Sequence, residues 1–192
     1  VPKFPLYKAD GTHGSLEWEH YPKPGDPNPI VKMGIAHISS NKVVWIEEDD
    51  SADQYTAWPF WSPDSKEMFY QILNRDQNDL QILSANPETG KNRLVYQEKN
   101  NTWVEFFEDI NILKNNKGFI LRSELDGWRH LYYYDMNGKL KKQLTKGEWN
   151  VSDIKQVDEK NERVFFEANK GDRLNTQLFV VDFDGDDLER LT

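Results

Sequence analysis

The sequence contains no cysteine among its 192 residues, and other features of common protein classes are also missing. Without cysteine, disulfide bonds, thiolate catalysis and cysteine-ligated metal sites are excluded. No stretch shows a sustained helical period, and no run is long and apolar enough for a transmembrane helix. The net charge is −9, with Lys and Arg dispersed among Asp and Glu, so the basic stripe of a nucleic-acid-binding protein is absent.

The residue patterns of a hydrolase or a metalloprotein are absent as well. No Gly-x-Ser-x-Gly pentapeptide occurs, and the nearest match, Ser15 after His13-Gly14, lacks the second glycine and a preceding apolar strand. We interpret Ser15 as a turn residue. The four histidines show no metal-ligand spacing, and in Asp182–Asp187 the glycine comes too early for a calcium loop. The sequence therefore predicts no catalytic residue, no metal ion and no cofactor.

The sequence does have a high aromatic content and an internal repeat. It contains 7 Trp, 8 Tyr and 10 Phe, and such side chains suit the half-buried face of a sheet. Three times, roughly 50 residues apart, the order is turn, strand, loop, strand, turn, strand. The equivalent leucines of the three copies are Leu80, Leu131 and Leu178, and then Leu94, Leu144 and Leu191. This repetition is typical of propeller blades.

The repeat predicts an all-β fold, a β-propeller fragment of about three and a half to four consecutive four-stranded antiparallel blades. We expect an incomplete, irregular blade with a proline-rich connector at 1–57, followed by blades at 58–100, 101–147 and 148–192. The first strands of these three blades are expected at 58–61, 103–107 and 149–153. So few blades form an arc with two uncovered end faces. The chain begins in the middle of a sequence unit at Val1 and stops on the last strand of a repeat at Thr192, so we expect it to be cut from a longer protein.

Five short sequence motifs, spread in order over essentially the whole chain, point to one family. They are Tyr21-Pro22-Lys23-Pro24-Gly25 with Asn28-Pro29-Ile30-Val31, Trp61-Ser62-Pro63-Asp64, Trp103-Val104, Asp126-Gly127-Trp128-Arg129-His130-Leu131, and Thr145-Lys146-Gly147-Glu148-Trp149. Together they resemble the propeller domain of the dipeptidyl peptidase IV family. The resemblance implies a two-domain serine peptidase of the prolyl oligopeptidase clan. In such a protein an eight-bladed propeller caps an α/β-hydrolase domain, which removes N-terminal dipeptides with proline or alanine in second place.

By this resemblance, the chain is part of a substrate-gating and positioning propeller, and it is inactive without the hydrolase domain. Its partners would be a peptide substrate and a C-terminal α/β-hydrolase domain, with no nucleic acid. A homodimer through the uncovered blade faces is a further option. The parent would be periplasmic or membrane-associated rather than cytoplasmic. The alternative function is a non-catalytic propeller interaction module, which a downstream sequence without Gly-x-Ser-x-Gly and a later Asp and His would favour.

Two adjacent phenylalanines are the candidate site residues. By the resemblance, the loop after Trp103-Val104 faces the cavity between the two domains, where Phe107, with Phe106 beside it, would line an extended substrate subsite. Neighbouring residues of a strand point to opposite faces, so we expect one ring to pack in the blade and the other to face the cavity. The alternative is ordinary blade packing of both rings. The flanking Glu105 and Glu108 differ from the basic residue expected in related peptidases.

Two further phrases have simple structural interpretations. The adjacent Glu47 and Glu48 follow an expected strand, and we interpret them as a solvated turn. The paired glutamates that clamp the substrate amine in this family would lie upstream of Val1. The segment Asp126–His130 is interpreted as a hairpin turn with an aromatic plug.

Overall fold

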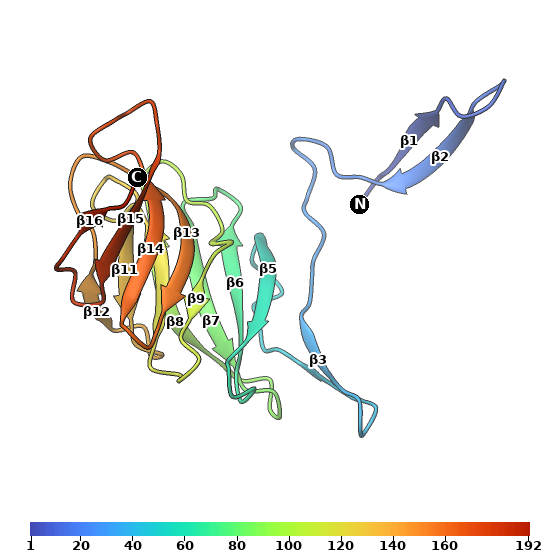
Figure 1. The fold of residues 1–192 in the computed structure, drawn as a ribbon. Coiled ribbons are helices and arrows are strands. Elements are labelled where there is room, and N and C mark those ends of the chain that lie inside the picture. Colours follow the sequence, from blue (N-terminus) through green and yellow to red (C-terminus); the bar gives the residue numbers. More distant parts are fainter.

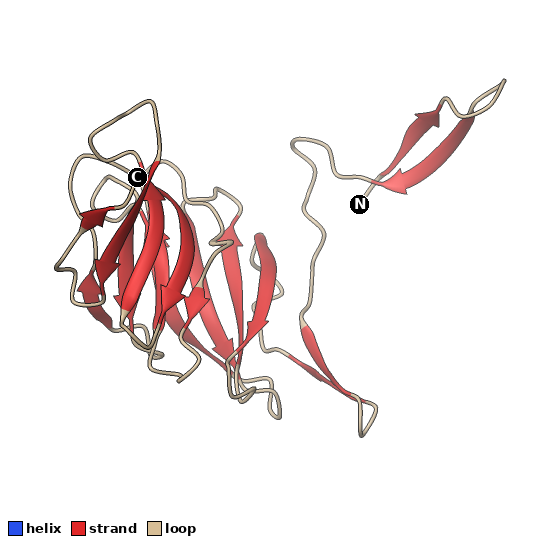
Figure 2. Ribbon diagram, in the orientation of Figure 1, coloured by secondary structure: helices blue, strands red, loops and turns tan.

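The computed structural model describes residues 1–192 and consists of 16 β-strands joined by turns and loops (Figure 2). The chain forms no helix with the length and apolar character needed to cross a membrane. The strands form three four-stranded sheets and two separate two-stranded hairpins. The prediction of an all-β chain of consecutive antiparallel sheets is therefore confirmed.

An N-terminal hairpin stands apart from the rest of the chain (Figure 1). It pairs β1 (Lys3–Lys8) with β2 (Ser15–His20). The segment that follows contains four prolines between positions 22 and 29. Proline lacks a backbone N–H and fixes φ, so this segment runs extended toward the next hairpin instead of joining a sheet.

The second hairpin and the three sheets follow in chain order. The hairpin consists of β3 (Gly34–His37) and β4 (Lys42–Trp45). The first sheet consists of β5 (Gln54–Trp61), β6 (Met68–Asn74), β7 (Asp79–Ala85) and β8 (Asn92–Lys99). The second sheet consists of β9 (Asn111–Ile112), β10 (Phe119–Ser123), β11 (His130–Tyr134) and β12 (Leu140–Gln143). The third sheet consists of β13 (Val151–Asp158), β14 (Arg163–Ala168), β15 (Gln177–Asp182) and β16 (Glu189–Arg190).

Every sheet is an antiparallel meander in which strands pair in sequential order. The expected strand at 103–107 is wrong, because residues 103–110 are irregular and the second sheet begins only at the two-residue strand β9. The first strands of the other two sheets begin at Gln54 and Val151, not at 58 and 149. The physical reason for the missing strand is a side-chain contact described below.

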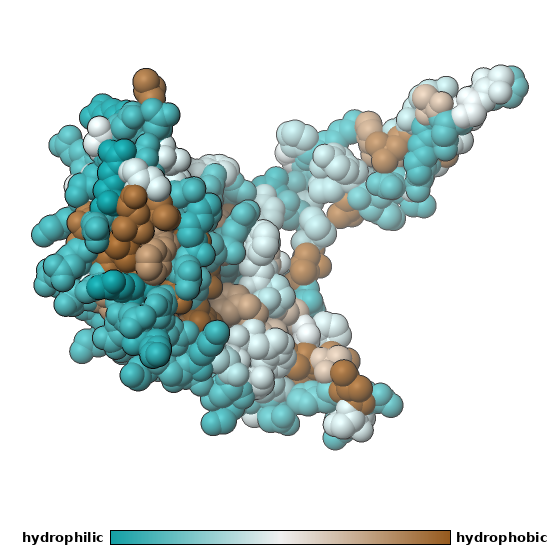
Figure 3. Space-filling view, in the orientation of Figure 1, coloured by the Kyte–Doolittle hydropathy of each residue, from teal (hydrophilic) through white to brown (hydrophobic).

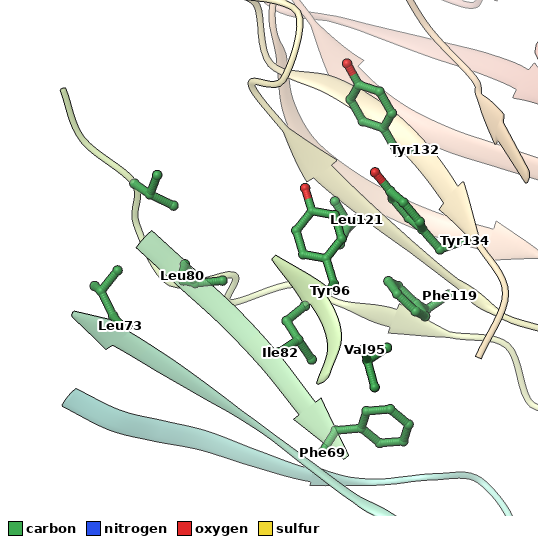
Figure 4. Close-up of a cluster of buried hydrophobic side chains, with 11 residues drawn as sticks. Phe69, Leu73, Leu80, Ile82, Val95, Tyr96, Phe119, Leu121, Tyr132 and Tyr134 are labelled. Carbon is green, nitrogen blue, oxygen red and sulfur yellow. The ribbon is translucent and has the colours of Figure 1, made fainter. Parts of the chain in front are cut away.

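Apolar side chains on both faces of the sheets hold neighbouring units together. Along β6, Tyr70 packs in a cluster with residues of the β3–β4 hairpin, whereas Phe69 packs in a cluster with the second sheet. Along β10, Phe119 faces the first sheet and Ile120 faces the third. Figure 4 shows the cluster between the first and second sheets. Each fully buried side chain of this size contributes about 2 kcal/mol, which explains why sheets with apolar residues on both faces stack in series.

A close contact between a turn glycine and the backbone of the preceding unit recurs along the chain. Gly90 (φ 74°) and Gly138 (φ 81°) lie in the turns before β8 and β12. A Cβ at Gly90 would lie 2.1 Å from the carbonyl oxygen of Trp45, and one at Gly138 would lie 1.5 Å from that of Val95. Trp45 ends β4, and Val95 lies in β8, the fourth strand of the first sheet. The β3–β4 hairpin therefore contacts the first sheet through β4 in the same way as the first sheet contacts the second through β8.

Candidate functional site

A cavity of about 580 Å³ opens where the first and second sheets meet. Its wall combines strand ends with the irregular segment 103–109. The charged or aromatic residues that line it are Trp58, Glu98, Trp103, Glu105, Phe106, Phe107, Glu108, Asp109, Arg122, Glu124 and Arg129. The volume is within the range of small-ligand sites and suits one or two side chains of a peptide.

One buried side chain holds the middle of the irregular segment. Gln71 of β6 is fully buried, and its Nε2 donates to the carbonyl oxygen of Phe107 over 2.8 Å. The N–H of Phe107 in turn donates to Oε1 of Gln71, also over 2.8 Å. The primary amide thus takes the place of a neighbouring strand, which is why the segment does not pair with β10. Sequence reasoning missed Gln71, although a polar residue inside the apolar run 68–73 is a signal that could have found it.

Both predicted site residues line the cavity. Phe107 contacts Tyr96 edge to face, with ring centroids 5.8 Å apart, and both Phe106 and Phe107 pack against the buried cluster between the sheets. The expected alternation, with one ring packed and the other facing the cavity, is wrong because the segment is not a strand. Each ring is half-buried and presents part of its surface to the cavity.

A buried carboxylate lies beside this aromatic wall. Glu98 is 6% exposed, and its Oε2 accepts hydrogen bonds from the Tyr96 hydroxyl and from Ser123 Oγ, each over 2.7 Å. Burial, with a smaller contribution from the Glu98 charge, raises the pKa of Tyr96 far above its usual value. Tyr96 therefore remains a neutral donor to the carboxylate. The hydroxyls of Tyr96, Tyr132 and Tyr134 all point toward the same end of the cluster (Figure 4).

The two arginines in the wall are engaged with other groups. Nε of Arg122 lies 2.6 Å from Oδ2 of Asp109, and its Nη1 donates to the carbonyl of Ser152. Nη2 of Arg129 lies 2.8 Å from Oε1 of Glu124. The Arg122 contacts join the irregular segment to the second and third sheets and so fix one edge of the cavity.

The other candidates from the sequence have structural roles. Ser15 is an exposed residue at the start of β2. His130 is fully buried, with Nδ1 3.0 Å from Thr145 Oγ1 and Nε2 2.8 Å from the carbonyl oxygen of Gly147. The turn that precedes it joins β10 to β11 as expected.

The two acidic segments, Glu47-Glu48 and Asp182–Asp187, do not form a metal site. Glu48 is half-buried and accepts a hydrogen bond from Thr56 Oγ1 over 3.1 Å, so it is more than a solvated turn residue. Burial raises the pKa of Glu48. Asp182 pairs with Arg163 over 3.1 Å. No group of three or more His, Asp or Glu side chains is placed to hold a metal ion.

Comparison with known proteins decides the family. Residues 1–192 match the family described as dipeptidyl peptidase IV (DPP IV) N-terminal region. This chain belongs to that family. The resemblance inferred from the sequence phrases is thus confirmed over the whole chain. The family is one of serine exopeptidases, and the chain covers only its N-terminal region.

Individual relatives agree with this assignment. The chain is 28% identical over 174 residues to dipeptidyl peptidase 4 of Trichophyton rubrum, an alignment that covers 85% of this chain and 22% of the relative. It superposes on the crystal structure of Porphyromonas gingivalis dipeptidyl peptidase 4 with a TM-score of 0.90 and 24% identity, over 100% of this chain and 27% of that one. A protein described as a dipeptidyl aminopeptidase IV from Bacteroides ovatus gives a TM-score of 0.84 and 29% identity, over 98% and 29%. The propeller fold is thereby confirmed, and the chain spans less than a third of each of these relatives.

Proposed function

We propose that this chain gates and positions peptide substrates for a serine-type dipeptidyl peptidase that removes X-Pro or X-Ala dipeptides from N-termini. The catalytic triad would lie in an α/β-hydrolase domain C-terminal to this chain. The observation that carries the proposal is a cavity with a preorganised aromatic wall in a chain of this family. Holding a peptide in a fixed pose converts an encounter into a nearly unimolecular step, an effect of several kcal/mol in favourable cases.

Phe106 and Phe107 are proposed to contact the substrate. The Gln71 amide and the edge-to-face contact with Tyr96 fix Phe107 before any ligand binds. A wall that is already ordered loses little conformational entropy when a peptide packs on it. Phe107→Ala in the full-length protein should raise KM for peptides that extend beyond the cleaved bond. A Gly-Pro chromogenic substrate, which has no such residues, should be affected much less.

The same proposal requires that the isolated chain be inactive. It contains no Gly-x-Ser-x-Gly elbow, and Ser15 lies on an exposed hairpin without a histidine partner among its hydrogen bonds. We expect the full-length protein to cleave a Gly-Pro chromogenic substrate and the isolated chain to release no product. Turnover by the purified chain, retained after removal of contaminants, would contradict the assignment of catalysis to another domain.

A division into units accompanies this function. We propose that an incomplete blade with its proline-rich connector precedes three successive blades, with boundaries at 100/101 and 147/148 as expected from the repeat, and with the expected boundary at 57/58 moved to 53/54 because β5 begins at Gln54. The repeated glycine contacts onto Trp45 and Val95 support a common inter-blade geometry. A homodimer of the parent is a further proposal; the contact expected from the sequence was the uncovered blade faces, and the apolar side chains exposed on the N-terminal hairpin offer a second candidate contact surface.

The second candidate is a propeller interaction module without a linked hydrolase. The exposed hairpin favours it, because large apolar side chains in water usually mark a binding surface. The sequence downstream of this chain distinguishes the two functions. A Gly-x-Ser-x-Gly elbow followed by Asp and His supports the peptidase, and its absence supports the interaction module.

A further inference from the structure

Glu98 is a buried carboxylate for which the chain supplies no cation. Its side chain is 6% exposed, lines the cavity and takes part in no ion pair with Lys, Arg or His. Only Oε2 is hydrogen-bonded, to Tyr96 and Ser123. Oε1 accepts no hydrogen bond. Removal of a carboxylate from water costs several kcal/mol, and buried charges in proteins are normally compensated by an opposite charge as well as by hydrogen bonds, whereas here the chain supplies two hydroxyl donors and no cation.

The surrounding wall adds negative charge that is also uncompensated. Five carboxylates and two guanidinium groups line the cavity. Both guanidinium groups are already paired, Arg122 with Asp109 and Arg129 with Glu124. Glu105 and Glu108 are exposed at the cavity and make no ion pair. The electrostatic potential of this wall therefore favours a positively charged ligand group.

The aromatic wall fits the rest of such a group. A lysine or arginine side chain has an apolar stem with a cationic end. The stem can pack on Phe107, while the cation reaches the carboxylate bonded to Tyr96, the residue that Phe107 itself contacts. A cation near an aromatic ring gains further stabilisation from the ring face.

We propose that this cavity binds a lysine or arginine side chain of the peptide substrate, with Glu98 as its counter-ion and Phe107 as its apolar support. The proposal rests on the peptidase function proposed above and adds a substrate preference to it. Glu105 and Glu108 would strengthen the preference from the exposed edge of the cavity. The peptidase would then select peptides with a basic residue shortly after the cleaved bond.

The test uses the full-length protein and a panel of Gly-Pro peptides. Each peptide carries one lysine, norleucine or glutamate at the first, second or third position after the cleaved bond. Norleucine keeps the stem and removes the charge. At one position we expect kcat/KM for lysine to exceed that for norleucine about tenfold, as for a hydrogen bond between charged groups. Equal values at all three positions would overturn the proposal.

Variants then assign the preference to Glu98. Glu98→Gln keeps the shape and an acceptor for Tyr96, and it should reduce the lysine-to-norleucine ratio to about one. Glu189→Gln, on the exposed strand β16 away from the cavity, removes the same charge and should keep the wild-type ratio. A ratio unchanged in Glu98→Gln would refute the role of Glu98. If that variant does not fold, Glu105→Gln with Glu108→Gln, both at exposed positions, should lower the ratio two- to threefold, and an unchanged ratio there counts against the proposal.

The same panel separates this preference from the proposed function. Cleavage of a Gly-Pro chromogenic substrate without any lysine preference would leave the peptidase intact and reject the cationic subsite. Absence of any cleavage would reject the peptidase. In that case fluorescence anisotropy of labelled lysine and norleucine peptides tests binding to the cavity independently of cleavage. Tighter binding of the lysine peptide that is lost in Glu98→Gln supports the subsite, and equal binding rejects it.

Discussion

Gln71 and Phe107, 36 residues apart, are joined by two hydrogen bonds of 2.8 Å that use both ends of the glutamine amide. Gln71 projects from β6 into the space between two sheets, beside a cluster of buried apolar and aromatic side chains. The two hydrogen bonds hold the irregular segment 103–109 in a fixed position relative to the first sheet. Together with the Arg122–Asp109 ion pair and the hydrogen bond from the Val104 N–H to the carbonyl of Gln77, they fix where the aromatic wall of the cavity lies.

Replacing Gln71 by leucine should release this segment. Gln71→Leu has a similar volume but leaves the N–H and carbonyl of Phe107 without partners, at a cost of about 2 kcal/mol. We expect faster hydrogen exchange in residues 103–109 of the full-length protein and a raised KM for extended peptides. Gln156→Leu, on an exposed position of β13, is the matched control and should change neither quantity. Unchanged exchange in Gln71→Leu would mean that other contacts hold the segment.

Two glycines with similar backbone angles should respond very differently to alanine. A Cβ at Gly127 (φ 92°) would meet no atom within 4 Å, whereas at Gly138 (φ 81°) the backbone of Val95 occupies the space that a Cβ needs. Both substitutions strain a left-handed residue at a cost of about 1 kcal/mol. Gly138→Ala must in addition separate two units, so we expect a loss of about 3 kcal/mol or more. Thermal unfolding midpoints of the full-length variants check this, and equal shifts would show that the turn moves freely.

The fold was predictable because each unit repeats both its apolar alternation and its turn residues. Leu80 and Leu131 occupy equivalent buried positions, and the turns at Gly90 and Gly138 recur with them. The strand expected at 103–107 was wrong for a physical reason. Its aromatic residues have high strand propensity, but propensity is outweighed where a side chain from another blade competes for the backbone.

The candidate site was only partly predictable. Phe106 and Phe107 came from the family resemblance; both line the cavity between the first and second sheets, and their contact with substrate stays a prediction. Glu98 and Gln71 were not found, because their roles depend on partners 25 and 36 residues away that no local pattern reveals. A charged or amide residue at a core position of an alternating strand is the available signal, and it indicates burial without naming the partner.

The buried tyrosines predict a loss of stability at high pH. Burial raises the pKa of Tyr134 to about 12 from its usual value of 10.0. Below pH 10 the phenol is neutral in both the folded and the unfolded state, so its full contribution is present. Above pH 10 the unfolded chain loses this proton first, and the free energy of unfolding falls by up to about 1.4 kcal/mol per pH unit until the folded pKa is reached.

Substitution separates this contribution from the other titrating groups. Tyr134→Phe should make the fall in unfolding midpoint between pH 10 and pH 11.5 shallower than in the unsubstituted protein. Tyr21→Phe changes a phenol that is 57% exposed and lies outside β1 and β2, and it should leave the slope as it was. Identical slopes for all three proteins would show that Tyr134 ionises as readily in the folded state as in the unfolded state.

The N-terminal hairpin should carry the contact of the proposed homodimer. Leu16 and Trp18 of β2 are 60% and 59% exposed, and their pairing partner residues include Tyr7, which is 68% exposed. These side chains share one face of an arm that Figure 3 shows projecting away from the sheets, with apolar residues at its surface. An arm with an exposed apolar face is stabilised when a second copy covers it.

Polar substitutions on this face test the dimer directly. We expect the full-length protein to sediment as a dimer and the double variant Leu16→Ser, Trp18→Ser to sediment as a monomer at the same concentration. Glu17→Ser with Glu19→Ser changes the alternate positions of the same strand, which point to the other face, and should leave the dimer in place. A monomeric unsubstituted protein at all concentrations would reject the dimer. A dimer that persists in the Leu16 and Trp18 variant would move the contact to the uncovered blade faces, where apolar side chains of the third sheet would be the next to substitute.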